Sequence, residues 1–467
     1  MPNANDHQRA LTQLRAGEYS YLDRDGQVYL DYTGAGLASR SQLQAHRDRV
    51  AGGLYGNPHS ESPASAASSR LIDDTRRSVL SFLHASPDEY AVIFTANATG
   101  ACRLVGEAYP FRRGAQLVLT ADNHNSVNGL REFARRRRAR TTVVPIRTPD
   151  LRADEGALVD TLTRGNHRRP RLLAYPAQSN FTGVQHPLSW VKLAQQKGFD
   201  VLLDAAAYLP TNPLHLDQVQ PEFVAISWYK IFGYPTGVGC LVARRSALAR
   251  LQRPWFSGGT VVGVSVQGDW HWLTDDESAF EDGTLNFLSI PDIQIGLRWL
   301  DSIGGTEAIQ RRVRTLTGLL LDRLGRLAHP NGRPMVVLYG PRDLRDRGGT
   351  VAFNLLDPDG RTVDERLVAR EATAARISLR TGCFCNPGAG EGAFELTGGQ
   401  LFNSHRWGQQ TVDDYLELIG LPTGGAVRVS LGLASNQADV DHFLNFVERT
   451  YRDRTASADG LAPRVRC

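Results

Sequence analysis

The stretch Phe223-Val-Ala-Ile-Ser-Trp-Tyr-Lys-Ile-Phe-Gly233 joins a short apolar run to a lysine and a glycine. A continuous apolar run of this length is typical of a strand that is covered on both faces, as in a parallel sheet. Six further runs have the same character, and stretches with a helical pattern separate them. They occupy residues 91–94, 116–119, 142–146, 171–175, 201–204 and 239–243. The alternation predicts a mainly parallel seven-stranded sheet in a large α/β domain.

A second, smaller domain is expected after about residue 305, where the pattern changes. A long amphipathic helix is predicted at 307–327, a shorter helix at 363–375 and a closing helix at 437–451. Strand-like runs lie at 335–339, 350–354, 377–379 and 427–430. We therefore expect an N-terminal segment 1–30 that packs with the small domain, a large domain 31–305, an α+β domain 306–452 and a disordered tail 453–467.

The composition excludes several classes of protein. The net charge is only +4 over 467 residues, which gives no support for nucleic-acid binding, and we interpret the arginine run 135–138 as a solvated helix face. The N-terminal region has no long apolar run, so neither a signal peptide nor a membrane span is predicted. Five irregularly spaced cysteines do not make a disulfide framework, and Cys467 is expected to be a terminal thiol rather than a catalyst. We expect a cytoplasmic protein with free thiols.

Lysine is rare in this sequence: Lys192, Lys197 and Lys230 are the only three among 53 basic residues. An aldehyde cofactor forms a stable imine with lysine but not with arginine, so a Schiff-base enzyme would have three candidates. Lys192 and Lys197 lie together in a predicted helix at 188–197. Lys230 stands at the end of a strand, beside glycines that let a cofactor approach the backbone. Lys230 is therefore the predicted Schiff-base lysine of an enzyme that uses pyridoxal 5′-phosphate (PLP).

Two more segments fit such a cofactor. Asp204 ends the apolar run 201–204, where a carboxylate without a partner is costly. It could hold the pyridine nitrogen of PLP protonated, or it could cap a helix that follows. Residues 94–100, Phe-Thr-Ala-Asn-Ala-Thr-Gly, pass from a strand into a helix. Backbone N–H groups and the Thr99 hydroxyl suit a phosphate there, although such turns are common.

The loop Arg380-Thr-Gly-Cys-Phe-Cys-Asn-Pro-Gly388 belongs to the predicted small domain. A flexible, glycine-bearing loop with two thiols beside an arginine suits a mobile nucleophile. A structural loop with incidental thiols is the alternative. A Cys-x-Cys pair without a second pair nearby is weak for zinc ligation, so no metal site is predicted.

In this order, the segments resemble the class V PLP-dependent enzymes and, within them, the cysteine desulfurases. The greatest likeness is to the amino-terminal domain of molybdenum-cofactor sulfurases. It spans roughly residues 20–450 and implies fold type I of the PLP-dependent transferases. The motifs that carry it are Tyr32-Thr-Gly-Ala-Gly36, Gly56-Asn-Pro-His-Ser60, Asp122-Asn-His-Asn-Ser126, Pro176-Ala-Gln-Ser-Asn-Phe-Thr-Gly183, Tyr229-Lys-Ile-Phe-Gly233, Phe280-Glu-Asp-Gly-Thr284 and the loop 380–388.

The resemblance implies roles around the cofactor. Lys230 would form the Schiff base and remove the Cα proton, Asp204 would face the pyridinium, and Asn180 would hydrogen-bond the phenolic oxygen. His124 would stack on the ring, with Asn123 as the alternative because the family's Glu-His pair is registered one position earlier. Phosphate contacts would come from Ala98, Thr99 and Ser227. Gly283 and Thr284 would reach the phosphate of a neighbouring subunit, which implies a homodimer.

The resemblance also implies the substrate side of the site. Arg428, in Val427-Arg-Val-Ser-Leu-Gly432, would hold the carboxylate of L-cysteine in a bidentate pair, with Arg380 near it. Cys385 would carry a persulfide, with Cys383 as the reserve candidate. The implied reaction is sulfur transfer from L-cysteine through that persulfide to an unidentified acceptor, with release of L-alanine.

This sequence departs from many desulfurases at two positions. They carry a glutamine three residues after the aspartate and a histidine before the lysine, where this chain has Ala207 and Tyr229, as in the molybdenum-cofactor-sulfurase branch. Sulfurases of that branch continue into a domain that binds the molybdenum cofactor, so we expect the sulfur acceptor to lie outside this sequence. A PLP-dependent C–S lyase that forms pyruvate and ammonia, or another amino-acid transformation in secondary metabolism, is the first alternative. A non-catalytic scaffold is the second.

Overall fold

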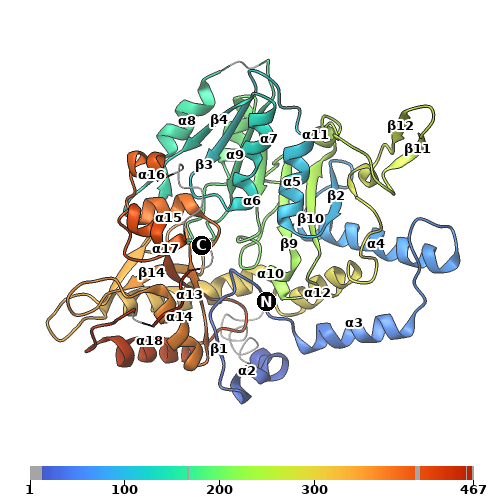
Figure 1. Cartoon of the computed structure of the whole chain (residues 1–467). Coiled ribbons are helices and arrows are strands. Elements are labelled where there is room, and N and C mark those ends of the chain that lie inside the picture. The colour runs from blue at the N-terminus through green and yellow to red at the C-terminus, as the bar shows by residue number, and fades with distance from the viewer. Residues whose placement is uncertain (1–12, 166–167, 405–410, 459, 465–467) are drawn as a thin grey trace.

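The computed structural model describes residues 13–165, 168–404, 411–458 and 460–464 (Figure 1). The large lobe is built on a seven-stranded sheet with the order β2-β10-β9-β8-β7-β3-β4. Its strands are β2 (Tyr90–Thr95), β3 (Gln116–Thr120), β4 (Arg140–Val144), β7 (Arg171–Pro176), β8 (Asp200–Asp204), β9 (Phe223–Ser227) and β10 (Gly239–Arg244). Strands β9, β8, β7, β3 and β4 are parallel neighbours, and β10 runs antiparallel to both β2 and β9. The predicted mainly parallel α/β architecture is confirmed.

Helices cover both faces of this sheet, which explains its continuous apolar runs. Along β2, Ala91 and Ile93 belong to the core on one face, whereas Val92 and Phe94 belong to the core on the other. Helices α5 (Ala98–Ala108) and α7 (Leu130–Arg136) contribute to the first core, and α4 (Pro63–Phe82) and α12 (Pro291–Ser302) to the second (Figure 1). Successive side chains of one strand are thus buried in two separate cores.

One of the seven predicted strands is placed differently. The sequence predicts a buried strand at 142–146, but β4 ends at Val144, and Ile146 begins a small hairpin of β5 (Ile146–Arg147) and β6 (Arg152–Ala153). Strand β4 is at the edge of the sheet, and Val143 is exposed. An edge strand is covered incompletely, so its apolar run overstated its burial.

The small lobe contains a four-stranded antiparallel sheet with the order β13-β14-β17-β16. Its elements are β13 (Val336–Tyr339), β14 (Thr350–Leu355), β16 (Arg380–Gly382), β17 (Ala426–Ser430) and the helices α13 (Gly305–Arg326), α14 (Glu365–Ala374) and α18 (Gln437–Tyr451). The predicted elements are found within two residues of their expected bounds. Strand β16 was missed, because the loop 380–388 begins with three residues that pair with β17. In that pairing Arg380 lies directly opposite Arg428.

The beginning of the described chain packs with the small lobe. Strand β1 (Val28–Tyr29) pairs in parallel with β15 (Ile377–Ser378), and Asp31 forms a further bridge to Ser430 of β17. A few residues later, the N–H of Gly36 donates to the carbonyl of Tyr229 in the large lobe. The segment after β1 therefore runs between the two lobes.

Part of the tail that the sequence predicts to be disordered makes defined contacts. Arg464 forms ion pairs with Asp364, Glu365 and Asp413. Three carboxylates around one half-buried guanidinium give this segment an attachment that its polar composition does not reveal. Cys467 lies outside the described residues.

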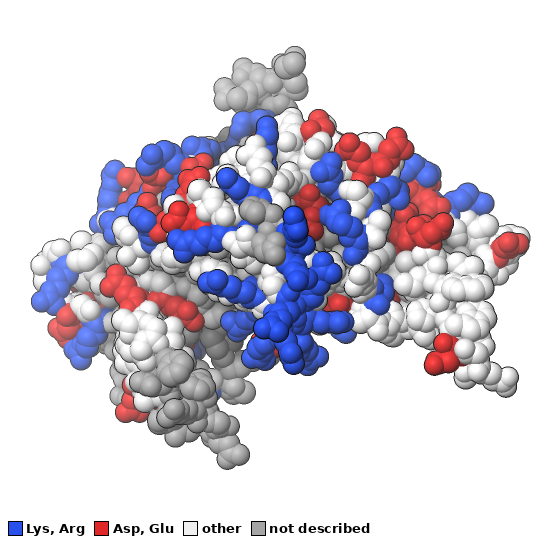
Figure 2. Space-filling model, turned by 90° about the horizontal axis from the view of Figure 1, so that it is seen from above, with Lys and Arg blue, Asp and Glu red and all other residues white. Residues whose placement is uncertain are grey.

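The surface has two notable features. Seen from above, basic side chains are densest near the middle of the view and are interspersed with acidic side chains toward both sides (Figure 2). Residues 135–138, at and beyond the end of α7, are all exposed, in line with their interpretation as a solvated face.

An unanticipated hairpin, β11 (Val261–Ser265) with β12 (Trp270–Leu273), projects from the edge of the large lobe (Figure 1, upper right). Within the described ranges, no helix has the length and apolar composition needed to cross a membrane.

Candidate active site

Lys230 lies in α10 (Trp228–Phe232), a short helix that follows the carboxyl end of β9. Gly233 ends this helix with a φ of 75°, and a Cβ atom there would overlap the backbone of Leu37 and Ala38. The turn is therefore possible because residue 233 is glycine. It places Lys230 in the wall of a pocket of about 370 Å³.

Loops from the carboxyl ends of five strands, β2, β3, β7, β8 and β9, form this pocket. Parallel strands end at one edge of a sheet, which is where such folds bind ligands. The pocket brings together seven of the predicted residues, which are Ala98, Thr99, His124, Asn180, Asp204, Ser227 and Lys230.

Asp204 ends β8 and is buried in this pocket. Its Oδ1 accepts a hydrogen bond from the backbone N–H of Ala206 at 3.0 Å, and the residues that follow form a turn rather than a helix. The alternative that Asp204 caps a helix is therefore wrong. A buried carboxylate at this place can take a protonated pyridine nitrogen as its counter-charge.

Burial shifts the two bases of the pocket toward their neutral forms. It lowers the pKa of Lys230, while Asp204 acts in the opposite direction and Arg428 adds to the lowering. The pKa of His124 is also lowered by burial, again against the effect of Asp204. A neutral amine suits Schiff-base chemistry, and a neutral imidazole suits stacking on an aromatic ring.

The structure separates the two candidates for ring stacking. His124 lines the pocket, and its Nδ1 accepts from the backbone N–H of Ser126 at 3.1 Å. Asn123 is buried beneath it, and its Nδ2 donates to the carbonyls of Thr120 and Ala174 in the sheet. Of the two side chains, His124 is the one that can touch a ring in the pocket.

The start of α5 forms a polar end of the pocket. The backbone N–H of Ala98 donates to Oγ of Ser227 at 3.0 Å. The hydroxyl groups of Thr99 and Ser126 lie 2.7 Å apart. A helix N-terminus beside three hydroxyl groups suits a phosphate group.

The two predicted substrate arginines share a carboxylate that the sequence reasoning missed. Asp31 accepts from Nη2 of Arg428 at 2.8 Å through Oδ1, and from Nη2 of Arg380 at 2.7 Å through Oδ2. Nη1 of Arg428 donates to the carbonyl of Asn180 at 2.9 Å, and its guanidinium lies 4.7 Å from the ring centroid of Phe384. Arg428 is thus buried, oriented and attached to the wall of the Lys230 pocket.

Hydrogen bonds join the cysteine loop to the same wall. Asn180 donates to the carbonyl of Phe384 at 2.8 Å, and the backbone N–H of Asn125 donates to the carbonyl of Cys385 at 2.7 Å. Cys385 is an exposed, free thiol, whereas Cys383 is disulfide-bonded, so the expectation of free thiols is wrong for Cys383. Cys385 is therefore the thiol of this loop that is available for chemistry.

Gly283 and Thr284 are not part of this pocket. Thr284 Oγ1 accepts from Nδ2 of Asn57 at 3.3 Å, and the carbonyl of Gly283 lies 3.3 Å from Nε2 of His59. Two motifs of the sequence, 56–60 and 280–284, therefore meet at a separate place on the large lobe.

The sequence matches the Aminotransferase class-V family over residues 28–443. The chain belongs to this family. Molybdenum cofactor sulfurase of Solanum lycopersicum is 36% identical over 486 aligned residues, which cover 97% of this chain and 59% of that protein. The chain spans less than two-thirds of the length of the curated relatives it matches.

Solved structures share the fold of this class V protein. A cysteine desulfurase from Thermococcus onnurineus NA1 has a TM-score of 0.77 at 23% identity, over 94% of this chain and 97% of that one. A cystine C–S lyase in complex with cysteine persulfide has a TM-score of 0.68 at 18% identity, over 90% of this chain and 97% of that one. The predicted fold type I of the PLP-dependent transferases is confirmed.

The pocket of this class V protein fits PLP. Lys230 offers an amine to the aldehyde, Asp204 a buried carboxylate to the pyridine nitrogen, and His124 a neutral ring to the face of the cofactor. The N-terminus of α5 and the hydroxyl groups of Thr99, Ser126 and Ser227 suit the phosphate, while the N–H of Ala98 already donates to Ser227.

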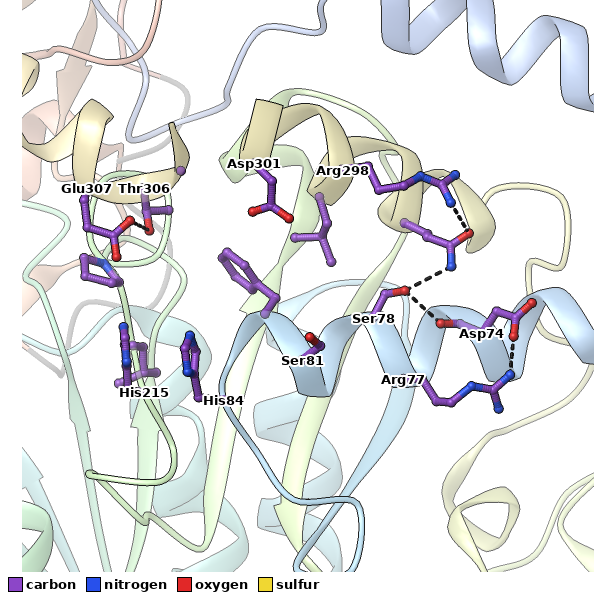
Figure 3. Close-up of a pocket in the computed structure, with 16 residues that line it drawn as sticks. Asp74, Arg77, Ser78, Ser81, His84, His215, Arg298, Asp301, Thr306 and Glu307 are labelled. Atoms are coloured by element: carbon purple, nitrogen blue, oxygen red, sulfur yellow. Dashed lines mark hydrogen bonds and ion pairs between the residues drawn. The ribbon is translucent and has the colours of Figure 1, made fainter. Parts of the chain in front are cut away.

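A larger hollow, of about 750 Å³, lies between α4, α12 and the start of α13 (Figure 3). His84 and His215 stack there with ring centroids 4.2 Å apart, and Arg77 pairs with its neighbour Asp74. None of the predicted site residues lines it. The smaller pocket around Lys230 is the better candidate because it gathers buried titratable groups, two of which have pKa values shifted by burial.

Proposed function

We propose that the chain is a PLP-dependent cysteine desulfurase. It takes the sulfur of L-cysteine onto Cys385 as a persulfide, releases L-alanine and passes the sulfur to an acceptor. The observation that carries this proposal is the attachment of the Cys385 loop to the Lys230 pocket through Asn180, which lines the pocket and donates to Phe384. A free thiol and a Schiff-base lysine are thereby built into one site.

In this proposal the pocket residues have different roles toward the substrate L-cysteine. PLP supplies an electron sink that weakens the Cα–H bond of the substrate. Lys230 holds the aldehyde and, once released from it, takes the Cα proton at Nζ, for which its lowered pKa favours the neutral amine. Asp204 keeps the pyridine nitrogen protonated, and Arg428 binds the substrate carboxylate.

The sulfur step balances without an external oxidant. The Cys385 thiolate forms an S–S bond with the sulfur of cysteine while the Cβ–S bond breaks, and the electron pair of that bond stays with the carbon. Cβ takes up a proton and Cα regains one, which gives alanine, while the sulfur of Cys385 becomes a persulfide. The pKa of Arg380, which begins the same loop, is raised chiefly by its hydrogen bond with Asp31.

The same proposal includes a homodimer that works in the cytoplasm. Gly283 and Thr284 lie outside their own chain's pocket, where they are available to the phosphate site of a second subunit. The nearby hairpin exposes large apolar side chains, which are Val262, Val264, Trp270 and Trp272. A two-stranded hairpin is only marginally stable without a partner, which supports a covered position in a dimer. A reducing compartment would keep the free thiol of Cys385 available, and it would also reduce the disulfide of Cys383.

The deciding experiment incubates the protein with L-cysteine and a reductant and measures alanine, sulfide and pyruvate together. Cys385→Ala is expected to keep the visible absorbance of bound PLP and to lose catalytic alanine release. Cys102→Ala is the matched control, because Cys102 is buried and its pKa is raised by that burial. Undiminished alanine release in Cys385→Ala and in Cys383→Ala would falsify the persulfide mechanism. Pyruvate and ammonia in place of alanine would assign the C–S lyase reaction instead.

A further inference from the structure

Asn386 directly follows Cys385, and its side chain is completely buried. Its Nδ2 donates to the carbonyl of Asp122 at 2.7 Å and to Oδ1 of Asn180 at 2.9 Å. Its Oδ1 accepts from the backbone N–H of Ala389 at 3.2 Å. The amide thus uses both of its donor hydrogens and one acceptor position, next to the residue proposed as the nucleophile.

These partners permit one orientation of each amide. The carbonyl of Asp122 can only accept and the N–H of Ala389 can only donate, so the nitrogen and oxygen of Asn386 cannot be exchanged. Nδ2 of Asn386 then requires Oδ1 of Asn180 as its acceptor, which leaves Nδ2 of Asn180 to donate to Phe384. Nδ2 of Asn180 has a second hydrogen, which is not used in the bond to Phe384. Because Asn180 lines the pocket, this hydrogen can be donated to a ligand bound there.

We propose that Asn386 is a positioning residue with two linked effects. It holds Asn180 as a hydrogen-bond donor toward the phenolic oxygen of PLP, and it fastens the Cys385 loop to the pocket wall. The inference rests on the proposed function, because it assigns that loop to sulfur transfer. A reversed Asn180 amide would set its own oxygen against the phenolic oxygen, which would leave both without a donor.

The backbone conformation of the Cys385 loop needs stabilising hydrogen bonds. Phe384 and Cys385 both have a positive φ, of 54° and 52°, in a region that residues with side chains rarely adopt. Such conformations persist where the surroundings over-determine them. Here the determinants are the hydrogen bonds from Asn125 to Cys385, from Asn180 to Phe384 and from Asn386 to both sides of the pocket wall.

Asn386→Asp tests the inference with little change of shape. It removes both amide donors but keeps an oxygen that can cap α15 (Pro387–Ala393), since Asn and Asp are similar N-caps. In the apoprotein, the backbone N–H of Asn125, which donates to the carbonyl of Cys385, is expected to exchange its hydrogen about tenfold faster, because a lost buried hydrogen bond favours opening of the loop. PLP binding, measured by equilibrium dialysis, is expected to weaken by about tenfold because Asn180 is no longer held as a donor.

Asn436→Asp is the matched control. Asn436 caps α18 through the N–H of Asp439 at 2.9 Å, away from the pocket, so neither readout should change. Asn386→Ser, which also caps a helix but adds no charge, replaces the aspartate variant if that variant does not fold. Wild-type hydrogen exchange at Asn125 together with wild-type PLP affinity in the folded Asn386 variants overturns the proposal. Neither readout needs turnover, so both remain informative if Cys385→Ala disproves the desulfurase reaction.

Discussion

Replacing Asp31 by asparagine is expected to destabilise the protein far more than replacing Arg380, although both residues belong to one ion-pair cluster. The carboxylate of Asp31 lies 2.8 Å from Nη2 of Arg428 and 2.7 Å from Nη2 of Arg380. The two arginines differ in burial, since the Arg428 side chain is 3% exposed and that of Arg380 is 51% exposed. Asp31→Asn keeps the shape of the side chain and removes its charge.

Burial sets the size of each effect. Without Asp31, the charge of Arg428 stays buried and loses its counter-charge, which costs about 3–5 kcal/mol. The pair with half-exposed Arg380 is solvated and contributes about 0–1 kcal/mol. Arg380→Gln leaves the Asp31–Arg428 pair intact, so its cost should stay within that second range. The two variants are therefore expected to differ by about 3 kcal/mol in the free energy of unfolding.

Urea unfolding of the apoprotein, followed by far-ultraviolet circular dichroism, measures this difference. The apoprotein is used because PLP bound to the folded state would add its own stabilisation. Equal losses in the two variants, or a loss below about 1 kcal/mol in Asp31→Asn, would refute the argument from burial.

Two further predictions concern the same site. Gly34→Ala should lower the melting temperature and weaken binding of substrate, because its Cβ would lie 2.5 Å from Oδ2 of Asp31 and 2.7 Å from Nη2 of Arg380. Gly17→Ala, with nothing within 4 Å of its Cβ, should show neither effect in the same melting and binding assays. Burial lowers the pKa of Lys230 below its ordinary 10.5, so between the two values the unfolded chain binds one more proton than the folded apoprotein. The free energy of unfolding should therefore rise with pH toward 10.5, by up to about 1.4 kcal/mol per pH unit. Lys230→Met should remove this slope in urea titrations at several pH values, and an unchanged slope would contradict the assignment.

The sequence predicted the large sheet well because its signal is local. A strand buried on both faces needs a continuous apolar run, and six of the seven runs became strands at their expected places. The exception, at 142–146, shows the limit of this signal. An apolar run does not reveal whether its strand lies at the edge of the sheet or between two other strands. Val143 is exposed because β4 is an edge strand.

The PLP pocket was predictable for a related reason. Its residues follow the carboxyl ends of parallel strands, and these ends meet at one edge of the sheet whatever the sequence distance between them. The ligands of the arginines were not predictable in this way. Asp31 is separated from Arg380 by 349 positions and from Arg428 by 397, and their contact depends on how β1, β16 and β17 are placed in the small lobe. The sequence did contain one signal for each of the two missed residues, which is its position beside a motif of the site. Asp31 directly precedes the motif 32–36, and Asn386 directly follows Cys385.

Many desulfurases carry a glutamine where this chain has Ala207, and here a neighbouring loop supplies an amide group at that wall of the pocket. Ala207 and Gln178 both line the pocket, and Nε2 of Gln178 donates to the carbonyl of Ala207 at 2.9 Å. Oε1 of Gln178 accepts from Nε2 of Gln185 at 3.0 Å, which orients the amide. Gln178 follows β7 and Ala207 follows β8, and these strands are parallel neighbours, so their loops leave the sheet side by side. An amide group therefore stands at this wall although residue 207 is alanine, and the substitution that set this sequence apart from many desulfurases does not make the wall apolar.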